Sequence, residues 1–383
     1  MSASSQMFGR SVGLFGGITG AMSALSCIAL LLTVGSAAAQ QCDWLPGHGV
    51  AGTAGQVNAI VTWDPDGAGP ASEVLVVGGQ LTAAGDTITG GVAAWDGSAW
   101  QALGFAGGDG GTAVNALAVF DGQLIAAGYL PLGGGLQHGV ARWDGAAWQL
   151  LGSGVEGDAF TAVNALAVHN GQLVAGGSVR SAAGAEYGCV ARWNGIAWRP
   201  MGSPLAGEFT MFTSATVKAL CVYADELIAG GRFTVSGIAP GHAIARWDGS
   251  DWQTVGAGMG DATDLVNALA LYNGELIAGG SFMIPGSPGC HNIARWNGSA
   301  WQALESGLDN EVAALTAYGS ELVAGGYFSA AGAVPCENIA RWNGTAWQAL
   351  GSGIASAVVY SSVHGLGVYN GELIVGGSFL LAG

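Results

Sequence analysis

The sequence predicts an all-β fold, a seven-bladed β-propeller of four-stranded antiparallel blades in which the last blade is incomplete. The first observation behind this prediction is a phrase such as IARWNGTAWQAL (339–350), which recurs along the chain of 383 residues. The second is a phrase such as VNALALYNGELIAGG (266–280), which precedes each copy of the first. The third is composition, because 69 glycines suit short strands and tight turns, whereas Gly in a helix interior costs about 1 kcal/mol relative to Ala.

One repeating unit shows why four strands are expected. Short apolar runs lie on both sides of Asn273-Gly274 and again on both sides of Asn297-Gly298. Asn-Gly is the dipeptide best suited to a two-residue type I′ hairpin turn, so each unit should form two hairpins. A single sheet of this kind cannot bury both of its faces, and a ring of stacked copies can. An open solenoid is the alternative, which the paired hairpins disfavour.

The predicted propeller covers residues 57–383 and divides into six full units and one partial unit. The approximate boundaries are 57–112, 113–162, 163–215, 216–264, 265–311, 312–361 and, for the partial unit, 362–383. Residues 40–56 resemble a fourth strand that leads into a first strand, so they are expected to close the ring from the N-terminus. The last blade then lacks its third strand. Either the ring tolerates a thin blade or the chain continues past Gly383, and the sequence slightly favours the latter.

The N-terminal segment is predicted to be a signal peptide, residues 1–39. An apolar run, densest at 27–35, is followed by small residues at Ala37 and Ala39, which predicts cleavage after Ala39. An uncleaved membrane anchor is the alternative. The mature protein is expected to be secreted, extracellular or periplasmic, and to have no membrane association after cleavage.

Charge and cysteine content exclude several classes of protein. The net charge of −16 argues against nucleic-acid binding, which needs clustered Lys and Arg. Five cysteines would remain after cleavage, an odd number whose spacing matches no zinc motif. They are Cys42, Cys189, Cys221, Cys290 and Cys336. We therefore predict no metal and no cofactor.

The order of signals within each unit resembles the kelch-like propeller family, the superfamily of the galactose oxidase central domain. Double glycines end the second strands, and an aromatic residue and a Trp follow. The double glycines are Gly78-Gly79, Gly176-Gly177, Gly230-Gly231, Gly279-Gly280, Gly325-Gly326 and Gly376-Gly377, with Ala127-Gly128 in the second unit. The chain departs from the family in having Trp where Tyr is usual, with Arg before it. The resemblance implies a divergent, bacterial-type secreted propeller and says little about activity.

An Arg-Trp dipeptide that recurs along the chain, here called the Arg-Trp step, is predicted to have a structural role. The members are Arg142-Trp143, Arg192-Trp193, Arg246-Trp247, Arg295-Trp296 and Arg341-Trp342, and a second Trp follows each first Trp five residues later. Glu226, Glu275 and Glu321 start the second strand in the later units. Because the second and third strands are antiparallel, Arg and Glu should form cross-strand pairs. The first unit has Ala94 and Val74 at these two positions, so both partners are missing together.

The innermost strand carries the predicted ligand-binding residues. One position near its start holds Asn58, Asn115, Asn164, Lys218, Asn267 and His364, with Ala313 in the sixth unit. These side chains should ring one mouth of the central channel. For the Asn residues, capping of the preceding loop is the favoured alternative. For Lys218, the only lysine, and for His364 both interpretations stay open.

Two His residues and a Glu at equivalent positions of consecutive units suggest a metal site, but the predicted fold disfavours it. His242, His291 and Glu337 hold the same position in consecutive units. Equivalent points on the third strands of adjacent blades should lie about 12 Å apart, too far for ligands about 2 Å from one zinc ion.

The sequence favours a non-catalytic binding or surface-display scaffold, and leaves open whether the protein is an enzyme. The partner would be an unknown protein or a glycan, and the protein is expected to be a monomer. Loops between strands two and three and between blades vary, so the ligand should meet the channel mouth on that face. The alternative is a secreted carbohydrate-active or oxidative enzyme, which should place unrelated polar residues together at one mouth.

Overall fold

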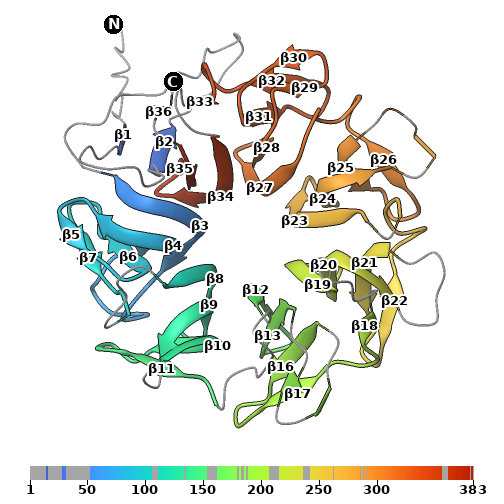
Figure 1. Ribbon diagram of the computed structural model, residues 1–383. Coiled ribbons are helices and arrows are strands. Elements are labelled where there is room, and N and C mark those ends of the chain that lie inside the picture. The colour runs from blue at the N-terminus through green and yellow to red at the C-terminus, as the bar shows by residue number, and fades with distance from the viewer. Residues whose placement is uncertain are drawn as a thin grey trace, which may run out of the picture.

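The computed structural model describes residues 14–15, 28–31 and 52–382 with short gaps. These gaps are 106–110, 133–134, 153–161, 179–180, 183–184, 187–188, 207–214, 236–241, 262, 285, 288, 290, 356–360 and 380. Every regular element in the described part is a β-strand, and the sheets stand around a central axis like blades (Figure 1). The predicted all-β propeller with four-stranded antiparallel blades is confirmed.

Six blades follow one another along the chain, each an antiparallel sheet whose strands lie in sequence order from the axis outward. The first strands, nearest the axis, are β3 (Thr53–Trp63), β8 (Ala113–Phe120), β12 (Val163–His169), β19 (Thr216–Tyr223), β23 (Leu265–Tyr272) and β27 (Val312–Tyr318). The second strands are β4 (Val74–Ala84), β9 (Gln123–Leu132), β13 (Gln172–Gly177), β20 (Glu226–Val235), β24 (Glu275–Met283) and β28 (Glu321–Gly326).

The outer half of each blade is shorter. The third strands are β6 (Val92–Trp95), β10 (Gly135–Trp143), β16 (Val190–Trp193), β21 (His242–Trp247), β25 (His291–Trp296) and β31 (Ile339–Trp342). The fourth strands are β7 (Trp100–Ala102), β11 (Trp148–Leu150), β17 (Trp198–Pro200), β22 (Trp252–Thr254), β26 (Trp301–Ala303) and β32 (Trp347–Ala349). Short accessory strands are β5 (Thr87–Ile88), β14 (Ser181–Ala182), β15 (Ala185–Glu186), β18 (Leu205–Ala206), β29 (Ala330–Ala331), β30 (Val334–Pro335), β33 (Ile354–Ala355) and β36 (Leu381–Ala382).

A last hairpin, β34 (Ser362–Tyr369) and β35 (Glu372–Ser378), lies between the sixth blade and the first. Its inner strand β34 contacts both β27 and β3. The Tyr369 hydroxyl donates a hydrogen bond of 3.2 Å to the backbone oxygen of Glu73. The ring is therefore closed by contacts between residues about 300 positions apart in the chain.

The outer edge of this last hairpin differs from the expectation. The sheet has the order β1-β2-β35-β34, in which β2 (Ile28–Leu31) pairs with β35 and β1 (Leu14–Phe15) pairs with β2. The expected empty third position is thus filled by a strand from within residues 1–39, because an open edge of N–H and C=O groups readily accepts another strand. Of the closing strand expected at 40–56, residues 40–51 lie outside the described residues, and Thr53 to Gln56 belong to β3. Cleavage after Ala39 stays a prediction.

The double glycines have a steric cause in a β-bulge that recurs on the inner strand. The β3–β4 register shifts between Val57 and Ala59, so Asn58 has no partner residue on β4. A Cβ on Gly79 would lie only 1.9 Å from the backbone oxygen of Gln56 beside this bulge. A Cβ on Gly78 would meet Val114 Cγ1 of the next blade at 2.7 Å. The second glycine makes room for the bulge, and the first makes room for the neighbouring blade.

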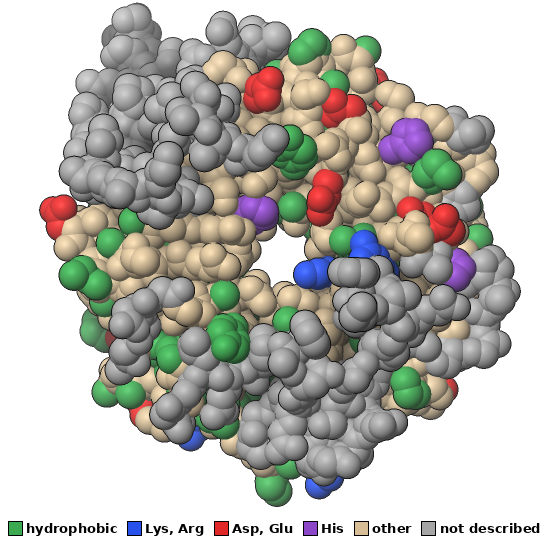
Figure 2. Space-filling model, in the orientation of Figure 1, with side chains coloured by type: hydrophobic (Ala, Val, Ile, Leu, Met, Phe, Trp, Pro, Cys, Tyr) green, Lys and Arg blue, Asp and Glu red, His purple; other side chains and the backbone are tan. Residues whose placement is uncertain are grey.

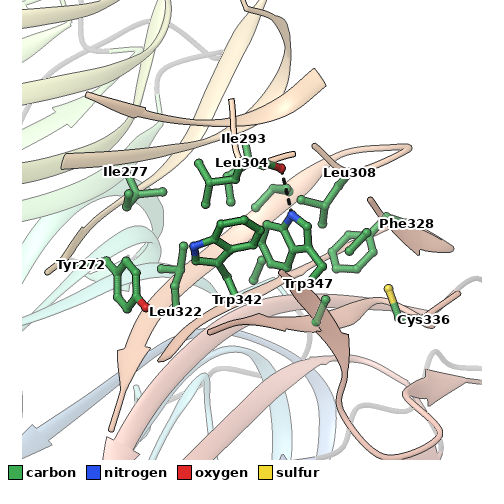
Figure 3. Close-up of a cluster of buried hydrophobic side chains, with 14 of the residues drawn as sticks. Tyr272, Ile277, Ile293, Leu304, Leu308, Leu322, Phe328, Cys336, Trp342 and Trp347 are labelled. Carbon is green, nitrogen blue, oxygen red and sulfur yellow. Dashed lines mark hydrogen bonds between the residues drawn. The ribbon is translucent and has the colours of Figure 1, made fainter. Parts of the chain in front are cut away.

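The Trp pairs of the second to sixth blades join each of these blades to the one before it. The two Trp of a pair contact each other across the third and fourth strands, with tilted rings whose centroids lie 5.3–5.6 Å apart. The second indole then donates to a backbone oxygen of the preceding blade, as Trp347 does to Leu304 over 3.1 Å (Figure 3). Equivalent bonds run from Trp148 to Leu103, Trp198 to Leu151, Trp252 to Met201 and Trp301 to Val255.

The two hairpin turns of a blade differ, although the sequence predicted the same type for both. At Asn273-Gly274 both φ angles are positive, 49° and 78°, as a type I′ turn requires. Between the third and fourth strands four residues intervene, because Trp296 pairs with Trp301. There Asn297 Oδ1 accepts the backbone N–H groups of Ser299 and Ala300, both at 2.9 Å. The side chain, and not a pair of left-handed residues, reverses the chain at this turn.

The predicted cross-strand pairs are confirmed in the fourth, fifth and sixth blades. Arg246 pairs with Glu226 at 2.5 Å, Arg295 with Glu275 at 3.4 Å and Arg341 with Glu321 at 3.1 Å. Arg341 and Glu321 have the least exposed side chains of the three pairs, 14% and 21%, against 39% and 36% for Arg246 and Glu226.

We expect Arg341→Ala to lower the free energy of unfolding by about 1–3 kcal/mol, because it leaves a carboxylate in a partly buried position without its charged donor. Arg246→Ala, at the more exposed pair, should cost less than about 1 kcal/mol. Urea denaturation of both variants at neutral pH makes the comparison. Equal losses would contradict the argument from burial.

Candidate functional site

The predicted ligand-binding residues all occupy the same structural position, the bulge of an inner strand. Register shifts flank Asn58, Asn115, Asn164, Lys218, Asn267, Ala313 and His364. A bulged residue has no partner on the neighbouring strand, so its side chain is free to point away from the ladder. Lys218 is exposed, and the other members are half-buried. Figure 2 shows a central opening with basic, acidic and His side chains near its rim.

The four Asn side chains that bridge blades have a structural role, although not the predicted one. Asn58 Nδ2 donates to the backbone oxygen of Val114 over 3.1 Å, and Asn115 Nδ2 donates to that of Val163 over 3.1 Å. Asn164 and Asn267 do the same to Val217 and Val312 at 3.3 and 3.2 Å. The amide therefore connects one blade to the next. The expected capping of the preceding loop is wrong, because the bulge directs the side chain toward the next blade.

The ring of amides is broken on the side of the channel that the later blades form. Asn267 Nδ2 donates to Glu311 Oε1 over 2.6 Å in addition to its backbone bond. His364 Nε2 lies 2.8 Å from Ser362 Oγ on the same strand. Lys218 stands where the fourth blade would have an Asn. Lys218, Ala313 and His364 replace the amide in three inner strands, and the Glu311 carboxylate and the Ser362 hydroxyl lie two residues before two of these positions.

Electrostatic interactions connect these groups. Lys218 is open to the channel but is enclosed by the surrounding inner strands, and the desolvation of its ammonium group lowers its pKa. The Glu311 carboxylate opposes that shift, and the Arg232 charge adds to it. Burial also lowers the pKa of His364, and Glu311 again opposes the shift. The imidazole is therefore neutral at neutral pH. Glu311 thus acts on the pKa of both Lys218 and His364.

Sequence reasoning missed Arg232 and Glu311. Arg232 is opposite Thr216 in the β19–β20 register, two residues from the bulge at Lys218. Glu311 directly precedes Val312 at the start of β27. Two features of the sequence pointed to these residues. The residue before the Val that precedes each bulge varies from blade to blade, and Glu311 is one such residue. Arg232 is one of the few Arg residues outside the Arg-Trp steps. A search limited to the bulge position itself could not find either residue.

The metal-site interpretation of His242, His291 and Glu337 gains nothing from the structure. Within the described ranges no group of three or more His, Cys, Asp or Glu side chains could hold a metal ion. Cys189, Cys221 and Cys336 are free thiols, and burial raises the pKa of Cys189 to about 12. Cys42 and Cys290 lie outside the described residues. Thiols that are protonated at neutral pH are poor nucleophiles and poor metal ligands.

Comparison with known proteins identifies the fold. No family model matches the chain, and no curated protein matches it. The chain is similar to the extracellular domain of a putative one component system from B. thetaiotaomicron, with 12% identity and a TM-score of 0.53 over 85% of this chain and 37% of that one. The extracellular domain of a putative hybrid two component system from the same organism gives 12% identity and a TM-score of 0.54 over the same shares. A third similar structure, YCF48 bound to D1 peptide, has 15% identity and a TM-score of 0.48 over 86% and 95%.

The present chain spans 37% of the length of the first two structures. At this level of identity the likeness establishes a β-propeller and no activity. Among the residues that the structure describes, no helix is long and apolar enough to cross a bilayer.

Proposed function

We propose that the protein is a secreted, non-catalytic binding module, a seven-bladed kelch-like propeller whose ligand meets the channel mouth at Lys218 and His364. The observation that carries the proposal is the broken ring of bulge residues. Where the side chain only joins blades, it is Asn. Two of the residues that replace Asn, Lys218 and His364, are titratable, and the Glu311 carboxylate acts on the pKa of both.

Several observations support the finer parts of this proposal. The last hairpin fills the space between the sixth blade and the first, as a seventh blade would. The double glycines and Trp pairs agree with a kelch-like repeat. A secreted location is consistent with the two structures described as extracellular domains. Cleavage after Ala39 would remove β1 and β2 and leave the outer edge of β35 open. The mature protein would act as a monomer, without cofactor or metal.

The chemistry of the mouth favours a polar ligand that carries an acidic group. Lys218 and Arg232 place two positive charges near the channel mouth. Because the net charge of the chain is −16, an anionic group would be attracted to the mouth and repelled by the rest of the surface. Asn267, Ser362 and neutral His364 offer hydrogen bonds for hydroxyl or amide groups. An acidic glycan or an acidic segment of a partner protein has both features.

An enzyme at the same mouth is the second candidate, and one contact favours it. Ser362 Oγ lies 2.8 Å from Nε2 of His364, whose lowered pKa keeps the imidazole able to accept a proton. A hydroxyl activated in this way would attack an ester or glycosidic centre. Hydrolysis of a simple aryl ester that is lost in both Ser362→Ala and His364→Ala would favour this candidate over the binding module.

A glycan array and a set of acidic peptides are the test of the binding module. Binding should weaken at least tenfold in Lys218→Ala and at least threefold in His364→Ala, and should fall with added salt, because charge attraction carries it. A variant that alters the Asn170-Gly171 turn, on the opposite side of the blades, is the control and should bind normally. If the turn variant loses binding while folded and Lys218→Ala keeps it, the wrong face has been chosen.

A further inference from the structure

A pocket opens between the first and second blades at the place where later blades hold the Arg–Glu pair. In the fourth blade Arg246 is the register partner of Ile228, and in the first blade Ala94 is the partner of Val76 at the same position. Val74 likewise stands where the fourth blade has Glu226. Both side chains of the pair are thus replaced by short apolar ones, and the pocket lies where their longer side chains would extend.

The pocket has a volume of about 360 Å³, within the range of small-ligand sites. Val74 and Ala94 belong to the first blade, and Gln123, Trp143 and Asp144 to the second. Trp63 completes the wall, and its indole is fixed by a 3.0 Å hydrogen bond to the backbone oxygen of Gly122. Gly122 and Asp144 belong to hairpin turns, so the pocket opens on the side of the blades opposite to the starts of the inner strands. It is therefore separate from the channel mouth.

The walls are suited to a planar donor with an apolar stem. Trp63 and Trp143 offer aromatic surface, on which a guanidinium group stacks well. The amide oxygens of Gln101 and Gln123 accept hydrogen bonds, and Val74 and Ala94 provide apolar contact. Asp144 adds negative charge, since the backbone N–H groups of Ala147 and Ala146 hold its pKa below the ordinary value. A group with several N–H donors and a positive charge fits this lining better than a neutral ring.

In the later blades the position equivalent to Ala94 holds an arginine side chain. Arg341 Nη1 donates to both carboxylate oxygens of Glu321, at 3.2 and 3.1 Å, and its side chain is only 14% exposed. Blade geometry is repeated around the ring, so the first blade offers the space that an arginine side chain fills in the later blades, without an arginine of its own. The protein's charge of −16 further favours a cationic occupant.

We propose that this pocket binds an arginine side chain of a partner protein or peptide, which takes the place that Arg246, Arg295 and Arg341 occupy in their own blades. The guanidinium would stack on the Trp surface and donate to Gln123 and to the carboxylate of Asp144. The alkyl stem would contact Val74 and Ala94. This site is independent of the ligand proposed for the channel mouth.

The test uses the whole protein and three short peptides that differ at one residue, Gly-Arg-Gly, Gly-Lys-Gly and Gly-citrulline-Gly, capped at both ends. Calorimetric titration should show the Arg peptide binding with one site per chain, at least fivefold more tightly than the Lys and citrulline peptides. The double variant Val74→Glu, Ala94→Arg rebuilds the internal pair and should lose binding at least tenfold while unfolding at the same temperature or higher. Unchanged binding in that variant would overturn the proposal, and so would preferential binding of a neutral sugar.

A matched variant asks the reverse question. Glu275→Val with Arg295→Ala removes the pair of the fifth blade, and Asn343→Asp gives the neighbouring turn of the sixth blade the carboxylate that Asp144 supplies in the second. A second pocket should form, and the number of Arg peptides bound per chain should rise from one to two. A folded variant that still binds one peptide would show that the vacated position does not by itself select arginine, and the proposal would fail.

Discussion

Gly79→Ala is expected to lower the free energy of unfolding by more than about 4 kcal/mol, or to prevent folding. The added Cβ would lie 1.9 Å from the backbone oxygen of Gln56 and 3.0 Å from the Cα of Val57. Backbone atoms on both sides of a bulge cannot yield without breaking the β3–β4 ladder. Chemical denaturation measures the loss, and expression as insoluble protein would be its extreme form.

The adjacent glycine provides the control for this prediction. A Cβ on Gly78 would meet side-chain atoms only, Val114 Cγ1 at 2.7 Å and Leu117 Cδ1 at 3.1 Å. Side chains can turn, so Gly78→Ala should cost about 1–3 kcal/mol. The second blade already has Ala127 at the corresponding position, fully buried. If Gly78→Ala proves as damaging as Gly79→Ala, the bulge is not the reason for the double glycine.

Trp347→Ala should lower the free energy of unfolding by about 3–5 kcal/mol. The indole is 2% exposed, packs in a cluster with Leu304, Leu308 and Phe328, and is hydrogen-bonded to the preceding blade (Figure 3). Removing it leaves a cavity between two blades and a buried carbonyl without its donor. Thermal and urea unfolding of the variant give the measurement.

Trp347→Phe separates packing from hydrogen bonding. This variant keeps most of the ring volume and loses the Nε1 donor, so it should cost about 1–3 kcal/mol. Ile196→Ala serves as a baseline, because Ile196 is 83% exposed and its loss should change stability by less than about 0.5 kcal/mol. A Trp347→Ala loss no larger than the Ile196→Ala change would contradict the view that the second Trp fastens the blades together.

The sequence predicted the fold well because its signals are local and repeated. Asn273-Gly274 marks a hairpin by its own backbone preference, and Arg341 with Glu321 can be paired as soon as two strands are set antiparallel. The bulge was not predicted in this way, because it depends on a shift of register between two strands. Its mark in the sequence, the second glycine of each pair, lies on the neighbouring strand and not at the bulged residue.

The same reason limited prediction of the candidate site. Lys218 and His364 were found because they interrupt a pattern, whereas Glu311 and Arg232 sit at positions that have no pattern to interrupt. Their relation to Lys218 arises only when the fourth, sixth and last inner strands meet around the axis. The pairing of Ile28–Leu31 with β35 was also missed, since an edge strand accepts a segment by its free backbone groups and not by a sequence signature.

The recurring bulge separates two requirements that usually compete at one residue, keeping the sheet in register and presenting a variable side chain. The ladder residues on either side, Val57 and Ala59 in the first blade, must keep the sheet in register, whereas the residue between them takes no part in the ladder. Asn, Lys, Ala and His all occur at this place within one chain, and the hairpins around them are alike. Each blade thus has one inner-strand position that can be substituted in evolution without changing the sheet around it. A lineage of such proteins could acquire a new ligand by changing a few inner positions while its architecture stayed the same.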